Sequence, residues 1–221
     1  MTETEYCAAQ LDKIRAETRF ILAQAVREEQ EAVIAGIDRQ ERELEQIRAL
    51  SEINTYHFRA DFNEESVNDC IDTLNEWHNL AENSAWNICL NSPGGYLDYG
   101  LHLFDDLVAH SIRGGGTHHI TITARGMAAS MGSILLQAAD KRVVGKYSHI
   151  LIHQLSAGAF GTIGDLRDSM GRFELWNEQI IDIYMERAKM SRKKFVQAWE
   201  RTDWWLSADE AVALGFADRI G

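Results

Sequence analysis

A serine flanked by small residues stands where a predicted strand turns into a predicted helix. Ser130 lies in the segment 126–132, after a buried strand over 120–124 and before an apolar helical run over 134–139. Such a corner lifts the hydroxyl off the sheet and brings it near the free N–H groups that begin a helix. The segment is close to the nucleophile pattern G-x-S-x-G, with Ala128 in place of its first glycine. We therefore interpret Ser130 as a candidate nucleophile, with close packing of small residues as the alternative.

Two more side chains could activate this serine. A serine hydroxyl is a poor nucleophile unless a base lies within hydrogen-bond reach and a third group orients that base. His153 ends a predicted strand over 149–154, and Asp203 lies in a loop before a short helix that opens at Ser207. A serine on a corner, a histidine at a strand end and an aspartate in a loop are the residue types that nucleophilic catalysis needs.

A glycine-rich turn offers a site for the negative charge that develops in such a reaction. Pro93, the one proline of the chain, is followed by Gly94 and Gly95 at the end of a predicted strand over 86–90. Proline fixes φ, and the two glycines allow the backbone to approach a substrate closely. We expect backbone N–H groups here to receive an oxyanion together with the N–H of Met131. A plain turn is the alternative interpretation.

The elements around these residues predict an α/β fold. Strand patterns at 56–58, 86–90 and 120–124 alternate with helical patterns that begin after Asn63 and near Leu97. This alternation indicates parallel βαβ units, in which ligands bind outside the carboxyl ends of the strands. The glycine turn and the serine both follow such strand ends, so we expect them to face each other.

The first part of the chain differs from the rest. Residues 1–54 are rich in Glu, Gln, Arg and Ala, and we expect a helical N-terminal extension to a domain over 55–221. A coiled coil, packing on a neighbouring subunit and docking to another protein all stay open for this segment. Its apolar positions at helical spacing are Leu11, Ile14, Ile21, Val26, Val33, Ile37, Leu44 and Ile47.

Composition and charge narrow the class of partner. The 221 residues carry a formal net charge of −12, which argues against nucleic acid because phosphate binding needs clustered cations. No apolar stretch approaches the roughly 20 residues that span a bilayer, and the acidic start is unlike a secretory signal. The three cysteines (Cys7, Cys70 and Cys89) are widely spaced without a CxxC pair, so we expect a protein of the reducing cytoplasm.

We expect neither a metal nor a cofactor. His118 and His119 are adjacent and could be considered as a pair of metal ligands. Adjacent residues of a strand point to opposite faces, however, and would rarely bind one ion. The other histidines expected at the surface or on helix faces are His57, His78, His102 and His110.

Four segments together resemble the Clp protease proteolytic subunit (ClpP) family of serine peptidases. In the order and spacing of that family, they are Asn-Ser-Pro-Gly-Gly at 91–95, Gly-Met-Ala-Ala-Ser-Met-Gly at 126–132, Ile-His-Gln at 152–154 and Asp-Trp-Trp-Leu-Ser-Ala at 203–208. The resemblance covers about residues 55–221. It implies a ClpP/crotonase-like α/β fold of repeated β-β-α units.

The resemblance also implies roles and partners. Position by position, Ser130 is the implied nucleophile, His153 the base and Asp203 the acid that orients it. The N–H groups of Gly94 and Met131 form the implied oxyanion hole. Family subunits form seven-membered rings, two of which stack into a closed barrel around the serines, and the predicted helix over 162–190 matches the segment that joins the rings.

The N-terminal extension departs from the family pattern. Family members usually begin with a short axial loop that helps to engage a ring-shaped AAA+ ATPase, so the helical residues at 1–54 put that coupling in doubt. Such extensions are similar to those of phage and prophage forms, where a ClpP-like protease can process capsid or scaffold proteins. The resemblance therefore implies polypeptide substrates, a homo-oligomer, and either an ATPase or a phage capsid or scaffold protein as partner.

Two other classes of function stay open. A crotonase-superfamily acyl-CoA enzyme would share the fold and an oxyanion hole, but such enzymes rely on carboxylates rather than on a Ser–His–Asp set. A non-catalytic assembly subunit would use the same fold with the N-terminal helices as its main feature. The first hypothesis is a serine endopeptidase inside a self-compartmentalised oligomer.

Overall fold

The computed structural model describes residues 15, 18–19, 22, 24–27, 29–31, 33–37 and 54–221. The chain divides into two compact units, Met1–Ala49 and Leu50–Gly221, and each is considered by itself. The domain boundary predicted between residues 54 and 55 stays a prediction.

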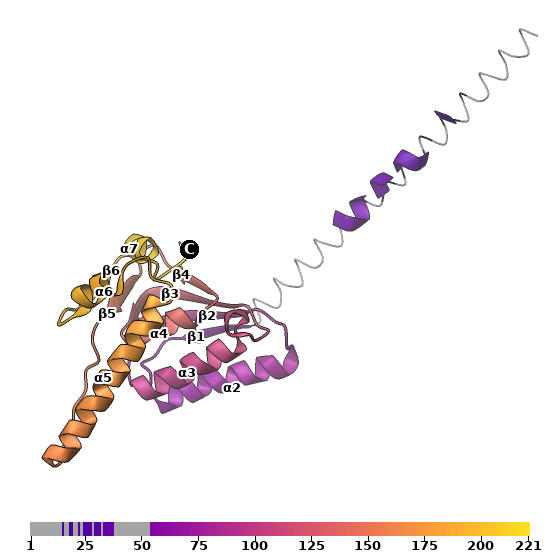
Figure 1. Ribbon diagram of the computed structural model, residues 1–221. Coiled ribbons are helices and arrows are strands. Elements are labelled where there is room, and N and C mark those ends of the chain that lie inside the picture. The colour runs from indigo at the N-terminus through magenta and orange to yellow at the C-terminus, as the bar shows by residue number, and fades with distance from the viewer. Residues whose placement is uncertain are drawn as a thin grey trace, which may run out of the picture. The chain divides into compact units, whose positions relative to one another are not determined.

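The described residues of the first unit are helical (Figure 1). Three members of the predicted apolar stripe, Val26, Val33 and Ile37, lie on this helix with about half of their surface exposed, at 47%, 58% and 51%. An ion pair joins Arg27 to Glu31 one helical turn further on, at 3.4 Å. The stripe positions outside the described residues are Leu11, Ile14, Ile21, Leu44 and Ile47.

The second unit contains the predicted α/β fold, with a mostly parallel sheet. Its described residues form a seven-stranded sheet in which five strands are hydrogen-bonded in the order β1-β2-β3-β4-β7, all parallel. Their bounds are Thr55–Phe58 (β1), Trp86–Ser92 (β2), Ile120–Ala129 (β3), Lys141–Val144 (β4) and Arg219–Ile220 (β7). The predicted alternation of strands and helices is confirmed.

Strand β3 changes neighbours halfway along its length. Its residues 121–124 pair with β4, whereas residues 127–129 pair with β5 (His149–Ile152), which in turn pairs antiparallel with β6 (Trp204–Leu206). Gly126 stands at the change with a φ of +89°, a value that favours glycine. The sheet therefore forks, and its second branch ends at the predicted catalytic residues.

The fork explains why the predicted strand over 120–124 was too short. Apolar alternation stops at Ala124, and the following residues are small or charged. The strand nevertheless continues to Ala129, because β5 supplies new hydrogen-bond partners beyond Gly126.

Helices α2 and α3 lie along one face of the sheet (Figure 1). Helix α2 (Glu64–Leu80) begins at Asn63, whose side chain accepts from the Ser66 N–H in a capping box, as the sequence predicts for Asn63. Helix α3 (Leu97–His110) follows the glycine turn, and a short 3-10 helix, Ile112–Gly114, leads toward β3.

Four helices complete the unit. They are α4 (Met131–Leu135), which continues as a 3-10 turn over Leu136–Ala138, α5 (Ile163–Met185), α6 (Arg192–Trp199) and α7 (Ala208–Leu214). Thr162 caps α5, Ser191 caps α6, and Ser207 forms a capping box with Glu210 at the predicted start of α7. The predicted helix over 162–190 is shorter than expected and ends at Met185.

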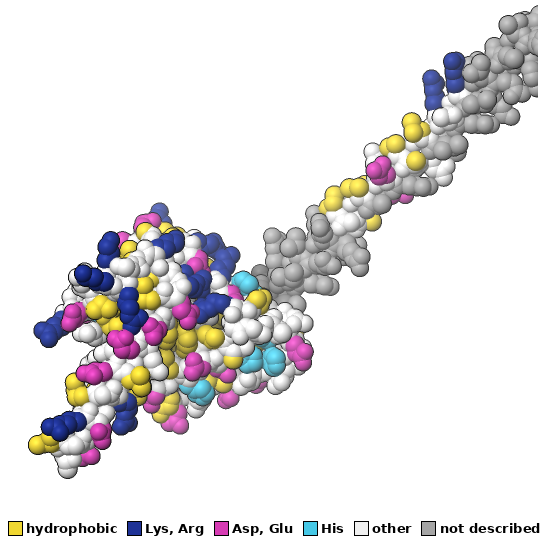
Figure 2. Space-filling view, in the orientation of Figure 1, with side chains coloured by type: hydrophobic (Ala, Val, Ile, Leu, Met, Phe, Trp, Pro, Cys, Tyr) yellow, Lys and Arg dark blue, Asp and Glu magenta, His cyan; other side chains and the backbone are white. Residues whose placement is uncertain are grey.

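The first half of α5 extends away from the rest of the unit (Figure 1). Its buried residues, Ile180, Ile181 and Tyr184, all lie in the second half. Apolar side chains in the first half are exposed, among them Ile163 at 73% and Met170 at 56%, and Figure 2 shows apolar and charged side chains mixed here.

The core fills the space between the sheet and its helices. Trp86, Leu90 and Ile122 have no exposed surface, and Phe58 and Phe62 stack with ring centroids 4.6 Å apart. Among the described residues, no helix is long and apolar enough to cross a membrane.

Candidate active site

Ser130 occupies a strained corner between β3 and α4. Its φ is 55° and its ψ is −122°, and it is one of two non-glycine residues with positive φ in the described part of the chain. Such a conformation costs about 1–3 kcal/mol and is typical of nucleophile turns between a strand and a helix. The side chain is half-buried, so the hydroxyl has access to the adjoining cavity.

Backbone and side-chain hydrogen bonds hold this corner in place. The Ser130 N–H donates to the Leu151 carbonyl of β5 at 2.9 Å. The Ser133 hydroxyl bonds to the carbonyl oxygens of Ser130 and Leu151 at 2.7 and 2.8 Å. The Ser133 hydroxyl has one proton, which it donates to the carbonyl oxygens because these can only accept. The Tyr184 O–H is therefore the donor in its 2.5 Å contact with Ser133 Oγ.

Tyr184 is suited to this supporting role. Burial raises the pKa of Tyr184 well above its usual range, and the hydrogen bond with Ser133 only partly offsets that effect. The phenol therefore keeps its proton at any physiological pH. Ser133 and Tyr184 were not singled out from the sequence, and no local pattern distinguishes them from ordinary helix residues.

His153 lies beside Ser130 at the end of β5. Parallel pairing sets Ala129 against Leu151, so Ser130 follows the last pair directly and His153 lies two residues past it, just after β5 ends. Ser130 and His153 line the same cavity, whose volume is about 90 Å³. The sequence prediction that these two residues converge is thus matched by their placement on one cavity.

Asp203 and His153 adjoin the ends of the paired strands β6 and β5. Antiparallel pairing sets Ile152 against Trp204. Continuing this register by one residue sets His153 against Asp203, and side chains of opposed residues have Cβ atoms about 4.5–5.5 Å apart. Asp203 is exposed and does not line the cavity that Ser130 and His153 share.

Gln154 connects the segment after His153 to the turn before Asp203. Its side-chain oxygen accepts from the Arg201 N–H at 3.0 Å, and Arg201 is the second non-glycine residue with positive φ among those described. The next residue, Leu155, donates its N–H to Asn177 of α5 at 3.4 Å. These bonds fix the chain on both sides of the candidate base and acid.

The three candidate catalytic side chains are not joined by hydrogen bonds. Within residues 54–221, all of which are described, no hydrogen bond joins the Ser130 hydroxyl to the His153 ring or that ring to Asp203. Catalytic hydrogen bonds are often long before substrate binds and tighten in the complex, so this arrangement is compatible with a resting site.

The glycine turn lies against the serine as expected, but its two glycines differ. Gly94 is buried and its N–H donates to Ser92 Oγ at 3.2 Å. Gly95 is exposed and lines the cavity with Ser130. Phe62 bonds to the Gly94 carbonyl and to the Tyr96 N–H, both at 2.8 Å, so the N–H of Gly95 between them points away from Phe62.

Two backbone N–H groups near Ser130 therefore remain without an acceptor among the described residues. They belong to Gly95 and to Met131, the first residue of α4, whose N–H has no partner within the helix. The sequence predicted an oxyanion hole made by Met131 and Gly94, not Gly95. The adjacent glycines indicated that the turn could supply an N–H, but only the bridge to Phe62 shows which glycine has its N–H unpaired.

The cavity has a mixed lining. Its apolar side chains are Leu97, Met131, Ile134, Leu155 and Ile180. Its polar side chains are Ser130, His153, Gln154 and Ser156.

Comparisons with known proteins agree with the four segments. A family model described as Clp protease matches residues 38–221, most of the chain. The chain is 31% identical over 179 residues to ATP-dependent Clp protease proteolytic subunit 1 of Chlamydia abortus, covering 78% of this chain and 88% of that relative. It is 34% identical over 135 residues to proteolytic subunit 2 of Chlamydia trachomatis, covering 60% of this chain and 63% of that relative.

The match spans the whole forked sheet and every candidate site residue. It begins before the described strands and continues to the last residue. The parallel α/β fold, the serine on its strained corner and the histidine beside it are consistent with that match. The chain therefore belongs to the Clp protease family.

Proposed function

We propose that the chain is a serine endopeptidase in which Ser130 is the nucleophile, His153 the general base and Asp203 the acid that orients it. The observation that carries this proposal is the shared cavity of Ser130 and His153, and the pairing of Ile152 with Trp204 supports a position for Asp203 near the histidine. The family membership supports peptide-bond chemistry, and the residues of the four segments supply the groups it needs.

In the proposed reaction, the imidazole of His153 takes the proton of the Ser130 hydroxyl as its oxygen attacks the peptide carbonyl. The carboxylate of Asp203 holds the ring in one tautomer and stabilises the imidazolium that forms. The imidazolium then gives its proton to the leaving amine, and water releases the acyl group by the same route in reverse.

The proposed oxyanion hole consists of the N–H groups of Met131 and Gly95. Both are free of other acceptors among the described residues, whereas the N–H of Gly94 already donates to Ser92 Oγ. Each fixed donor that contacts the oxyanion typically lowers the activation barrier of the reaction by about 3–4 kcal/mol. Gly94 has a different proposed role, which is to let the turn approach Ser130.

The proposed substrates are polypeptides with an apolar residue on the acyl side of the cleaved bond. The cavity beside Ser130 is apolar over Leu97, Ile134 and Ile180, and burial of an apolar side chain there would help to position the carbonyl. Fluorogenic peptides with leucine or methionine before the reporter are therefore the substrates to assay.

The proposed working form is a homo-oligomeric ring, heptameric and stacked in pairs as the family resemblance implies. Exposed apolar side chains on the first half of α5 support subunit contacts there. We further propose that residues 1–54 form a helical extension that docks a partner, either an AAA+ ATPase or a phage capsid or scaffold protein. The free thiols of Cys70 and Cys89 support a reducing cytoplasm as the site of action.

The decisive experiment compares Ser130→Ala with Ser169→Ala, a matched change on α5 away from the cavity. Loss of a triad serine lowers turnover by on the order of 10⁶. Ser130→Ala should abolish peptide cleavage and labelling by a fluorophosphonate probe, while Ser169→Ala should retain both.

The same assay separates the alternatives. Full peptidase activity in Ser130→Ala would refute the proposal. Turnover of an acyl-CoA thioester that survives Ser130→Ala would favour a crotonase-type enzyme. Absence of labelling in a fully assembled wild-type oligomer would favour a non-catalytic assembly subunit.

A further inference from the structure

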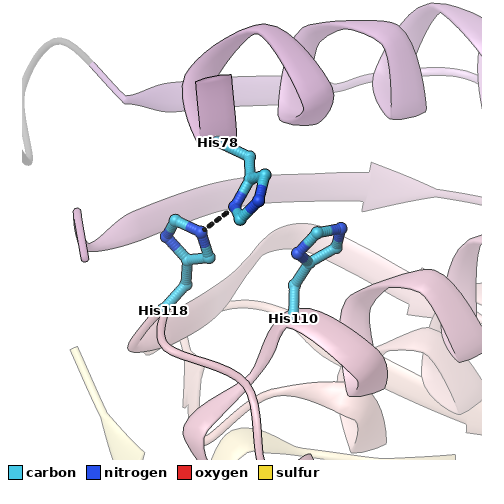
Figure 3. A group of neighbouring side chains, drawn as sticks. All are labelled: His78, His110 and His118. Atoms are coloured by element: carbon cyan, nitrogen blue, oxygen red, sulfur yellow. Dashed lines mark hydrogen bonds between the residues drawn. The ribbon is translucent and has the colours of Figure 1, made fainter. Parts of the chain in front are cut away.

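Three histidines from different elements converge at the end of the sheet opposite Ser130. His78 lies in the last turn of α2, His110 is the last residue of α3, and His118 stands just before β3 (Figure 3). One ring nitrogen from each lies within 4.8 Å of the other two. Figure 3 shows the three rings facing a common space.

The backbone fixes the relative positions of two of these residues. The His118 N–H donates to the His110 carbonyl at 3.0 Å, and the Ile112 N–H donates to the His118 carbonyl at 3.0 Å. Trp86 stacks on the His118 ring with centroids 3.9 Å apart. His118 has no exposed surface, so its ring has little freedom to turn elsewhere.

A hydrogen bond to the Ser84 carbonyl determines which nitrogen of His118 is available. The carbonyl can only accept, so His118 Nδ1, at 2.8 Å from it, carries the proton. The lone pair of the neutral ring is then on Nε2, which faces His78 Nδ1 at 2.9 Å. A backbone carbonyl that holds one ring nitrogen and orients the other is the usual arrangement of a metal-binding histidine, and here the second nitrogen accepts from His78 Nδ1.

We propose that His78, His110 and His118 bind one divalent transition-metal ion, with Zn²⁺ as the best match. Neutral imidazoles suit Zn²⁺ and similar ions, whereas Mg²⁺ and Ca²⁺ prefer oxygen ligands, and no carboxylate belongs to the cluster. Three protein ligands leave the fourth tetrahedral position for water.

The distances fit such an ion after small rotations of the rings. Nitrogens bound to Zn²⁺ at about 2.0–2.1 Å in a tetrahedron lie roughly 3.3 Å apart. The His78 and His118 nitrogens must separate slightly from 2.9 Å, and the widest pair must close from at most 4.8 Å. His78 must also move its proton from Nδ1 to Nε2, which is a change of tautomer and not of charge.

Access to the cluster is open on the helix side. His78 and His110 are half-buried, while His118 is fully buried behind them.

The expectation that this chain binds no metal rested on the adjacent pair of histidines. His118 is buried and His119 is exposed, so these two adjacent residues do not form a pair of ligands. The ligands that join His118 come instead from the ends of two helices. The bound ion would connect α2, α3 and the start of β3, a role independent of peptide cleavage.

The test uses the full-length protein after chelation and desalting. Co²⁺ titration should give the intense visible bands of a four-coordinate ion at one equivalent per chain, and Zn²⁺ should raise the melting temperature. His110→Gln should bind at least about tenfold more weakly, since loss of a supporting group alone costs 10–100-fold. His119→Gln, which removes an exposed neighbour, should bind as the wild type does.

A second variant distinguishes weaker metal binding from misfolding. His78→Gln alters a half-exposed side chain at a helix end and should weaken binding similarly, with an unchanged far-UV circular dichroism spectrum. The proposal is overturned if the wild type binds no stoichiometric Co²⁺ or Zn²⁺, if Co²⁺ gives only the pale spectrum of a six-coordinate ion, or if both variants bind as tightly as the wild type.

Discussion

The backbone of Gly94 packs directly against the side chain of Ser130. A Cβ added to Gly94 would lie 2.6 Å from the Cβ of Ser130, closer than real Cβ atoms approach, and 3.1 Å from its Oγ, which is also tight. Gly94 also has a φ of +108°, which other residues rarely adopt. The glycine is required because the turn and the nucleophile share the same space.

Gly94→Ala should therefore damage the site more than the fold. Displacement of a reacting group by about 1 Å can cost 10²-fold, so we expect turnover of a fluorogenic peptide to fall by about that factor or more. Gly171→Ala is the control, since it has open space in α5 and should slightly stabilise the helix. Wild-type turnover in Gly94→Ala would show that the close approach is unimportant.

Asp203→Asn should lower turnover and leave folding intact. The amide cannot stabilise the imidazolium of His153 and favours the wrong tautomer, and the comparable change in a serine protease costs about 10⁴ in turnover. Because Asp203 is exposed, the melting temperature should hardly change. Asp209→Asn, an exposed change on α7, is the control in kinetic assays, and equal rates in the two variants would remove Asp203 from the mechanism.

Ser133 and Tyr184 should show strong coupling in a double-mutant cycle. Ser133→Ala leaves the buried Tyr184 hydroxyl without a partner and removes one of the hydrogen bonds to the Ser130 and Leu151 carbonyls, so we expect a loss of about 1–3 kcal/mol in the free energy of unfolding. Adding Tyr184→Phe removes the stranded donor, so the double variant should be less destabilised than the sum of the single variants. Urea unfolding measures all three, and simple additivity would contradict the network.

The ion pairs of Asp218 should make stability depend on pH. Arg142, with only 3% of its side chain exposed, and Arg187 both bond to this carboxylate, at 2.7 and 2.8 Å. Burial raises the pKa of Asp218, but the hydrogen bonds and charges of the two arginines outweigh it and hold the pKa below its usual value. The stabilisation is therefore complete above the unfolded pKa of about 3.9 and is lost as pH falls through the lower folded value.

Asp218→Asn should cost about 2–3 kcal/mol at pH 7, because it leaves a buried guanidinium without its counter-charge. The difference from wild type in urea unfolding should shrink when the pH is lowered to about 3. Glu178→Gln breaks the exposed pair with Arg192 and should cost less than about 1 kcal/mol at either pH. A difference that does not depend on pH would contradict this assignment.

Periodicity and capping residues predicted much of the fold. Asn63, Ser191 and Ser207 begin helices as their side chains indicate, because each satisfies an N–H that no helix residue can. The second half of β3 was not predicted, since its small residues show no alternation. Its strand geometry depends on β5, a partner that local sequence does not specify.

Site residues were predictable to the extent that they lie at strand ends. Ser130 and His153 follow parallel strands, and topology brings such positions to one edge of a sheet. The choice between Gly94 and Gly95 required the bridge to Phe62. The grouping of His78, His110 and His118 required the packing of two helix ends against a loop, which no spacing in the sequence records.

The fork at Gly126 divides strand β3 into two parts with different neighbouring strands. Residues 121–124 of β3 pair with both β2 and β4, while residues 127–129 pair with β5 and retain a single pair with β2, between Ala128 and Ser92. Separation of β5 from β3 would disperse the reactive groups and leave the larger branch intact. A preparation of this protein can therefore keep a native circular dichroism spectrum and a cooperative melt while every active site in it is dismantled.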